Sequence, residues 1–115
     1  MNEFNFSLQP GKKEYKKIEH NQQKPIISVV IPFYNSGKYI EQTIITVLNQ
    51  TFPYYEVLIV DDGSKDEKSL KKLEEIEKMD ARIKVFHKQN EGLAATRDFG
   101  ARHSSAVSYT HLTLP

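Results

Sequence analysis

The chain has 115 residues, enough for one small domain with its own hydrophobic core but not for two. Its formal net charge of +1 excludes the strong field that attracts nucleic acid, and the absence of cysteine excludes disulfides, thiolate catalysis and zinc–thiolate sites. No apolar run approaches the roughly 20 residues of a membrane helix, and the N-terminus lacks the apolar core of a signal peptide. We therefore expect a cytoplasmic protein.

Residues 1–24 are polar, with Pro10 and Gly11 adjacent and hydrophobic side chains too sparse for a core element. This composition predicts a flexible N-terminal arm. The alternative is a short helix that docks on a partner or a membrane surface through Tyr15 and Ile18.

The structured region begins with a β-branched run, Ile26–Ile31, which ends at Pro32 and is typical of a strand buried on both faces. Apolar side chains then recur at helical spacing, which predicts a helix from Lys38 to about Gln50. Ser36 is its expected N-cap, and Pro53 stops it.

Two further strand–helix units follow. A second buried strand is predicted at Tyr55–Val60, then a helix capped by Ser64 or Asp66, with Leu70, Leu73, Ile76 and Met79 on one face. A third strand is predicted at Ile83–Phe86, and residues 91–105 form a third helix rich in small residues. Three alternations of strand and helix predict a doubly wound, mostly parallel α/β sheet.

Ligands of such sheets bind beyond the carboxyl ends of the strands. The loops expected there read PFYNSG, DDGSKD and HKQNEG, all rich in hydrogen-bonding residues. Asp61 and Asp62 thus lie at the mouth of the predicted site, where the imide N–H of uracil or ribose hydroxyls would offset the cost of two adjacent like charges. The alternative is that DDGS is only a turn followed by a helix cap.

Two common nucleotide folds are disfavoured by their motifs. The loop after the first strand has one glycine instead of G-x-G-x-x-G, and the P-loop motif G-x-x-x-x-G-K-[ST] is absent from the sequence. A receiver domain would place its acid pair after the first strand, where this chain has none.

Several motifs, taken together and in this order, resemble those of a known protein family. The P-x-Y-N after the first strand, LNQTFPYYE before the second, VDDGS after it, and NEGLAATRDFG resemble the start of a family 2 glycosyltransferase of the GT-A fold. The resemblance covers residues 26–105, and it implies a Rossmann-like, nucleotide-binding N-terminal part of such an enzyme. Family members bind a nucleotide-sugar, usually with UDP, and transfer the sugar to an acceptor hydroxyl.

The resemblance implies nucleotide-binding roles for six residues. Tyr34 lies near the base, where its ring would stack on uracil, and Asp62 meets the uracil while Asp61 orients the loop or the ribose. Asn35 is expected to hold its loop by side-chain to backbone bonds. The complete set is Pro32, Tyr34, Asn35, Asp61, Asp62 and Arg97.

Two of these positions, Tyr34 and Arg97, have an alternative. Tyr34 would otherwise be a core aromatic residue. Arg97 would meet the base or the phosphates, or would be a structural arginine paired with Asp98, a position where relatives often have Asn. Gly92 and Gly100 are expected to permit close helix packing.

The end of the chain departs from the family. Relatives continue through a further strand into D-x-D, whose acids hold a divalent metal, manganese or magnesium, at the diphosphate. Residues 106–115 contain no acid, although Val107, Tyr109, Leu112 and Leu114 suit a strand. We therefore expect metal ligands and catalytic residues to lie outside this chain, and the tail to be atypical. We expect no catalysis from the 115 residues alone.

The sequence thus predicts a flexible arm at 1–24, a partial transferase domain at 25–105 and an atypical tail at 106–115. The full-length enzyme would use a UDP-sugar and an acceptor glycan or lipid-linked glycan, in the cytoplasm or at the inner face of the membrane. The alternatives are a non-catalytic nucleotide-binding module, an inactive truncated product and an unrelated α/β binding domain.

Overall fold

The computed structural model describes residues 25–51, 54–106 and 108–114. The arm predicted at residues 1–24, the helix stop at Pro53 and the strand residue Val107 lie outside this part of the chain.

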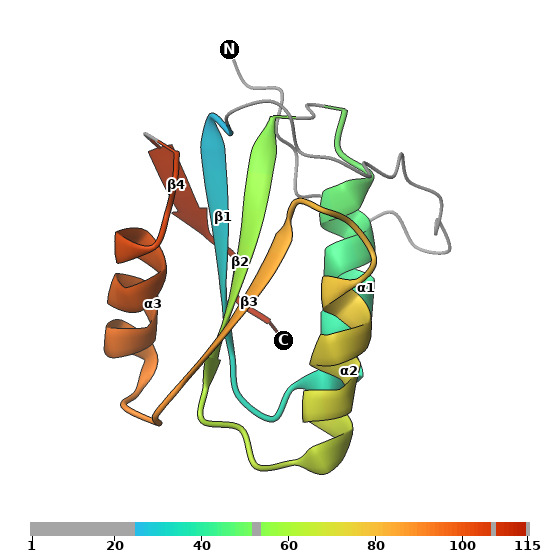
Figure 1. Cartoon of the computed structure of the whole chain (residues 1–115), viewed down its shortest axis with the longest axis vertical. Coiled ribbons are helices and arrows are strands. Elements are labelled where there is room, and N and C mark those ends of the chain that lie inside the picture. The colour runs from blue at the N-terminus through green and yellow to red at the C-terminus, as the bar shows by residue number, and fades with distance from the viewer. Residues whose placement is uncertain (1–24, 52–53, 107, 115) are drawn as a thin grey trace.

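Four strands form one sheet in which each pair of neighbours is parallel, in the order β3-β2-β1-β4 (Figure 1). The strands are β1 (Ile27–Phe33), β2 (Tyr55–Asp62), β3 (Ile83–Lys88) and β4 (Ser108–His111). The predicted parallel sheet is confirmed. The predicted strand ends are wrong, because β1, β2 and β3 continue to Phe33, Asp62 and Lys88.

Pro32 lies inside β1 rather than in the loop after it. A proline has no N–H to donate, so it is tolerated where no strand needs that donor. The carbonyl of Val30 accepts from the N–H of Leu112, just past the end of β4. Alternate residues of a strand face the same neighbour, so the nitrogen of Pro32 also faces β4, but beyond the last paired residue of that strand. No interstrand hydrogen bond is therefore lost at Pro32.

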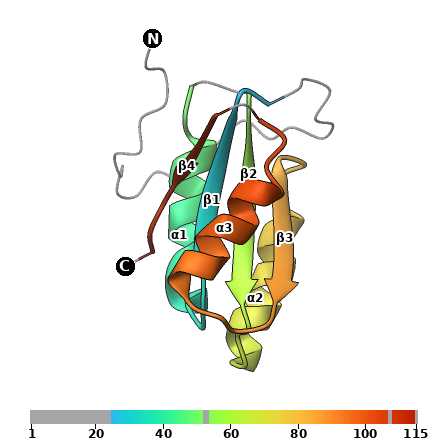
Figure 2. The same ribbon diagram turned by 90° about the vertical axis from the view of Figure 1, so that its left-hand side faces the viewer.

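The helices cover both faces of the sheet. α1 (Gly37–Leu48) and α2 (Glu67–Glu77) lie side by side on one face, and α3 (Leu93–Arg102) lies on the other (Figures 1 and 2). The doubly wound α/β architecture is therefore confirmed. Among the described residues, no helix combines the length and the apolar character needed to cross a membrane.

The helix starts differ in how they are capped. The carboxylate of Asp66 accepts from the backbone N–H of Ser69, so Asp66 is the N-cap of α2 as predicted. Ser36 occupies the N-cap position of α1, but its hydroxyl donates to the carbonyl of Tyr34 instead. The predicted N-cap residue of α1 is therefore correct, but its side chain makes no capping hydrogen bond.

The larger core lies between the sheet and the α1–α2 layer, where β1 and β2 face buried side chains of both helices. A smaller cluster on the α3 face consists of Val30, Leu58 and Val60, with Phe86 and Phe99 packed against it. All eight residues of β2 are buried, including three with carboxylates. A strand buried along its whole length fixes the centre of the sheet.

Two glycines of the third helical segment have different roles. A Cβ on Gly100 would overlap Cγ1 of Val30, so this glycine permits the close approach of α3 to β1, as predicted. The same prediction is wrong for Gly92, whose added Cβ would meet nothing within 4 Å. Gly92 is needed for its backbone, because its φ of 97° is disfavoured in other residues.

We predict that Gly100→Ala destabilises the fold by about 1–3 kcal/mol, because the added methyl overpacks the contact with Val30. Urea unfolding of wild type, Gly100→Ala, Val30→Ala and the double variant measures this. Val30→Ala should relieve part of the cost in the double variant. Full additivity of the two substitutions would contradict this contact.

Candidate functional site

The order of the strands creates a switch point at the carboxyl ends of β1 and β4. The chain moves from β1 to β2 and β3 on one side, and then crosses back through α3 to place β4 on the other side of β1. In open α/β sheets, ligands bind in the crevice at such a point. A pocket of about 270 Å³ lies here, between the ends of β1 and β2, the start of α3 and the segment after β4.

Polar and apolar side chains both line the pocket. Three of the six predicted residues line it, and three do not. Its lining residues are Pro32, Phe33, Tyr34, Ser36, Asp62, Asn90, Leu93, Thr96, Thr113 and Leu114.

Tyr34 is half exposed at the pocket, directly after β1, so it is not a core aromatic residue. The next residue, Asn35, fixes this loop. Its side-chain oxygen accepts from the backbone N–H groups of Lys65 and Asp66, at 3.0 and 3.1 Å, and its own N–H donates to Ser64 Oγ. This is the side-chain to backbone bonding expected of Asn35. It joins the loops after β1 and β2, and the side chain of Tyr34 beside them stays half exposed.

Asp61 and Asp62 end β2, so their side chains point to opposite faces of the sheet. Asp61 is 2% exposed; it accepts from the N–H of Ser64 at 2.9 Å, and its Oδ2 lies 2.8 Å from Nδ1 of His87. It therefore shapes the turn after β2 and does not line the pocket. Opposite orientation also reduces the repulsion that adjacent carboxylates would otherwise have.

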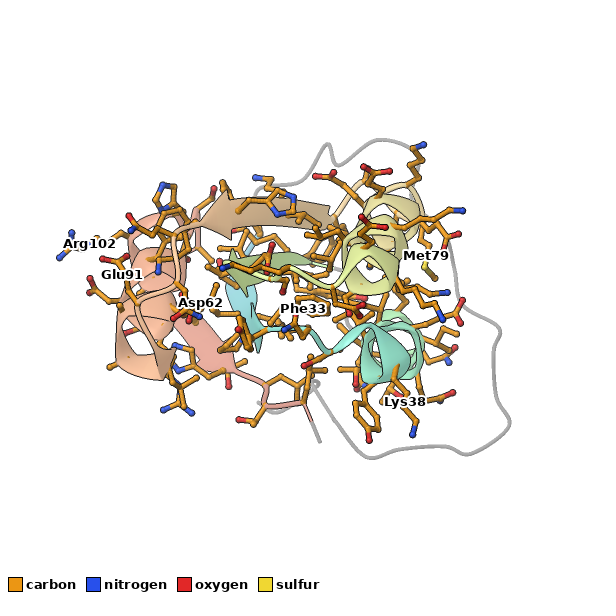
Figure 3. All side chains as sticks on the ribbon, turned by 90° about the horizontal axis from the view of Figure 1, so that it is seen from below. Phe33, Lys38, Asp62, Met79, Glu91 and Arg102 are labelled. Carbon is orange, nitrogen blue, oxygen red and sulfur yellow. The ribbon has the colours of Figure 1, made fainter. Side chains whose placement is uncertain are left out.

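Asp62 faces α3 and lines the pocket (Figure 3). Its Oδ1 accepts from Lys88 Nζ at 3.0 Å and from the N–H of Glu91 at 2.8 Å, and its Oδ2 accepts from the N–H of Gly92 at 3.0 Å. The carboxylate thus holds the loop between β3 and α3 against the end of β2.

That loop approaches β2 closely. The side-chain amide of Asn90 donates to the carbonyl of Asp62, and a Cβ on Gly63 would lie 2.8 Å from the backbone nitrogen of Asn90. Any side chain at Gly63 would push the two loops apart. The pocket wall therefore depends on glycine at this position.

Sequence reasoning missed most residues of this wall. Lys88 pairs with Asp62 and Glu91, a contact that was not predicted. Asn90 was expected only as part of a polar loop at the site, and Leu93 and Thr96 were not expected there. The one available signal was the polar loop HKQNEG, which parallel pairing places beside DDGS.

Burial alone would raise the pKa of the Asp62 carboxyl. The hydrogen bonds from the N–H of Glu91, from Lys88 and from the N–H of Gly92 outweigh it and hold the pKa below the usual value of 3.8. A carboxyl whose pKa is lowered by folding stabilises the folded state at any pH above its pKa in the unfolded state. That stabilisation is lost as the pH falls through the pKa of the folded state.

We predict that the carboxyl carbon resonance of Asp62 titrates with a midpoint below that of an exposed aspartate, because its three hydrogen bonds favour the charged form. A pH titration followed by NMR measures this, with Asp62→Asn as the control that removes the transition. A midpoint at or above the value of an exposed aspartate would contradict these contacts.

Arg97 lies on α3 but not among the pocket-lining residues, although its neighbour Thr96 is one of them. The alternative pairing of Arg97 with Asp98 is not seen in the structure, where Asp98 bonds Arg102 at 2.9 Å. Within the described residues, the buried Nε of Arg97 has no hydrogen-bond partner. A role at the base or the phosphates stays a prediction.

Within residues 25–51, 54–106 and 108–114, no group of three or more His, Asp or Glu side chains could hold a metal ion. The acids nearest the pocket are already engaged by the protein, Asp61 by Ser64 and His87, and Asp62 by three donors. These residues do not fit a divalent cation.

The family model "Glycosyl transferase family 2" matches residues 28–107. The chain belongs to this family. The match includes residues 28–33 of β1, all of β2 and β3, the three helices and every residue for which a nucleotide-binding role was predicted.

The chain is similar to an uncharacterized glycosyltransferase of Rickettsia conorii, with 47% identity over 78 residues, 68% of this chain and 13% of the relative. It is 43% identical over 76 residues to TuaG of Bacillus subtilis, named for teichuronic acid biosynthesis, covering 65% of this chain and 30% of TuaG. The chain thus spans less than a third of either relative.

Among solved structures, S. aureus TarS in complex with UDP matches 76% of this chain and 27% of its own, with a TM-score of 0.68 and 27% identity. TarS in complex with UDP-GlcNAc matches 76% of this chain and 26% of its own, with a TM-score of 0.62 and 29% identity. The GT-A fold is therefore confirmed, and this chain corresponds to about a quarter of these structures.

Proposed function

We propose that the chain carries the nucleotide-binding part of a hexosyltransferase that uses a UDP-sugar and an acceptor hydroxyl on a glycan or lipid-linked glycan. The observation that carries this is the pocket at the switch point, where an exposed tyrosine ring and a charged carboxylate lie at one opening. The similarity to TarS, solved with UDP and UDP-GlcNAc, supports the nucleotide, and the name of TuaG supports a polysaccharide product.

The proposed contacts follow from the chemistry of the two side chains. Tyr34 offers an exposed ring on which a base can stack. Asp62 Oδ2 accepts one hydrogen bond within the described residues, which leaves it able to accept another from the imide N–H of uracil. With the base bound between these two groups, the ribose and the diphosphate would lie toward the opening of the pocket.

The sugar-transfer step needs charge stabilisation on the departing diphosphate, which a divalent cation supplies in this family. Since the described acids do not fit such an ion, we propose that manganese or magnesium is held by residues beyond those described here. The described residues would bind and orient the nucleotide.

We predict that UDP binds the chain more tightly than ADP does, and that Asp62→Ala weakens UDP by about 1.5–3 kcal/mol, the scale of a hydrogen bond to a charged group. Isothermal titration calorimetry measures both. Equal affinity for UDP and ADP, or an unchanged affinity in Asp62→Ala, would reject the assignment of Asp62 to the base.

We also predict that Tyr34→Ala weakens UDP by about 1–3 kcal/mol, the scale of one stacked base. Tyr39→Ala is the matched control, because Tyr39 is also an exposed tyrosine but does not line the pocket. The same titration of both variants separates the ring at the pocket from a general surface effect. If the two variants behave alike, stacking on Tyr34 is wrong.

A further inference from the structure

Lys88 ends β3 directly opposite Asp62 in the parallel register. Its side chain is only 8% exposed, and its ammonium donates to three oxygens: Asp62 Oδ1 at 3.0 Å, Glu91 Oε1 at 2.9 Å and the carbonyl of Gln89 at 2.7 Å. An ammonium has three donors, so all of them are used inside the protein. Lys88 is therefore unavailable to a ligand and acts on the other groups of the site.

The two oxygens of Asp62 differ because of Lys88. Each carboxylate oxygen offers about two acceptor positions. Oδ1 receives Lys88 and the N–H of Glu91 and is filled, whereas Oδ2 receives only the N–H of Gly92 within the described residues. The lysine thus fixes which oxygen of this pocket-lining carboxylate is fully engaged by the protein and which keeps an acceptor position.

We propose that Lys88 is the positioning residue that makes the pocket selective for a base with a ring N–H, uracil, over cytosine. It holds Asp62 as a fixed, charged acceptor whose Oδ2 meets the base. This inference rests on the proposed function and names the group that sets its base specificity.

The selectivity follows from the edges of the two pyrimidines. N3 of uracil carries a proton and donates to a carboxylate, whereas N3 of cytosine carries a lone pair and faces the same oxygen as a second acceptor. Two acceptors in contact repel, and both lose their hydrogen bonds with water. If Asp62 were free to rotate or to become protonated, it would tolerate either base.

Lys84 provides a matched control on the same strand. Its ammonium also bonds a buried carboxylate of β2, Glu56 Oε1 at 3.1 Å, but at the amino end of the sheet and away from the pocket. Lys88→Met and Lys84→Met each remove one cation from β3 and leave one acid of β2 without it. Only the first alters the carboxylate at the pocket.

The experiment titrates UDP and CDP by calorimetry into the 115-residue wild type and the two variants. We expect Lys88→Met to reduce the ratio of UDP affinity to CDP affinity about tenfold and Lys84→Met to leave this ratio within about twofold of wild type. A loss of general stability would move both affinities together and leave the ratio unchanged. An unchanged ratio in Lys88→Met overturns the inference.

An NMR titration of the Asp62 carboxyl carbon without nucleotide judges the same inference independently. Lys88→Met should raise the midpoint relative to wild type and Lys84→Met, and an unchanged midpoint overturns the role of Lys88. Wild type that binds neither nucleotide would refute the proposed function, and this second measurement would still decide whether Lys88 holds Asp62. Lys88→Gln replaces Lys88→Met in both measurements if the latter does not fold.

Discussion

The structure depends on β2, a strand buried at all eight positions that nevertheless carries three carboxylates. Burying a charge without partners costs several kcal/mol, so each carboxylate must draw donors from another segment. Each therefore fixes one piece of chain against the strand. Glu56 engages Ser28, Lys84 and the N–H of Ser105; Asp61 engages Ser64 and His87; Asp62 engages Lys88 and the N–H groups of Glu91 and Gly92.

Glu56 acts at the end of the sheet opposite the pocket. Burial alone would raise its pKa, but the hydrogen bonds from Ser28, from the N–H of Ser105 and from Lys84 outweigh it and hold the pKa below its usual value. Because Ser105 lies between α3 and β4, this carboxylate anchors the return of the chain to the far side of β1. The crevice between β1 and β4 thus depends on a charge buried at the other end of the strand.

The basic side chains that meet these acids come mainly from β3, which lies at one edge of the sheet. On the face of the sheet that α3 covers, Lys84 and Lys88 bond acids of β2. On the opposite face, His87 contacts Asp61. An edge strand can keep long basic side chains partly in water while their ends meet buried acids. Although the net charge of the chain is close to zero, basic residues of β3 pair with acidic residues of β2. One of these pairs, Lys88 with Asp62, includes a residue that lines the pocket.

The sequence by itself determined the elements, because buried β-branched runs, helical spacing and the Asp66 cap are local patterns; its combined motifs also identified the family. Local patterns do not fix where a strand ends or what lies across from it. Only the tertiary structure decided that β2 runs on through Asp61 and Asp62, which turns one carboxylate to the pocket and the other away. Parallel register then placed Lys88 on Asp62, a contact between residues 26 apart that no spacing along the chain encodes.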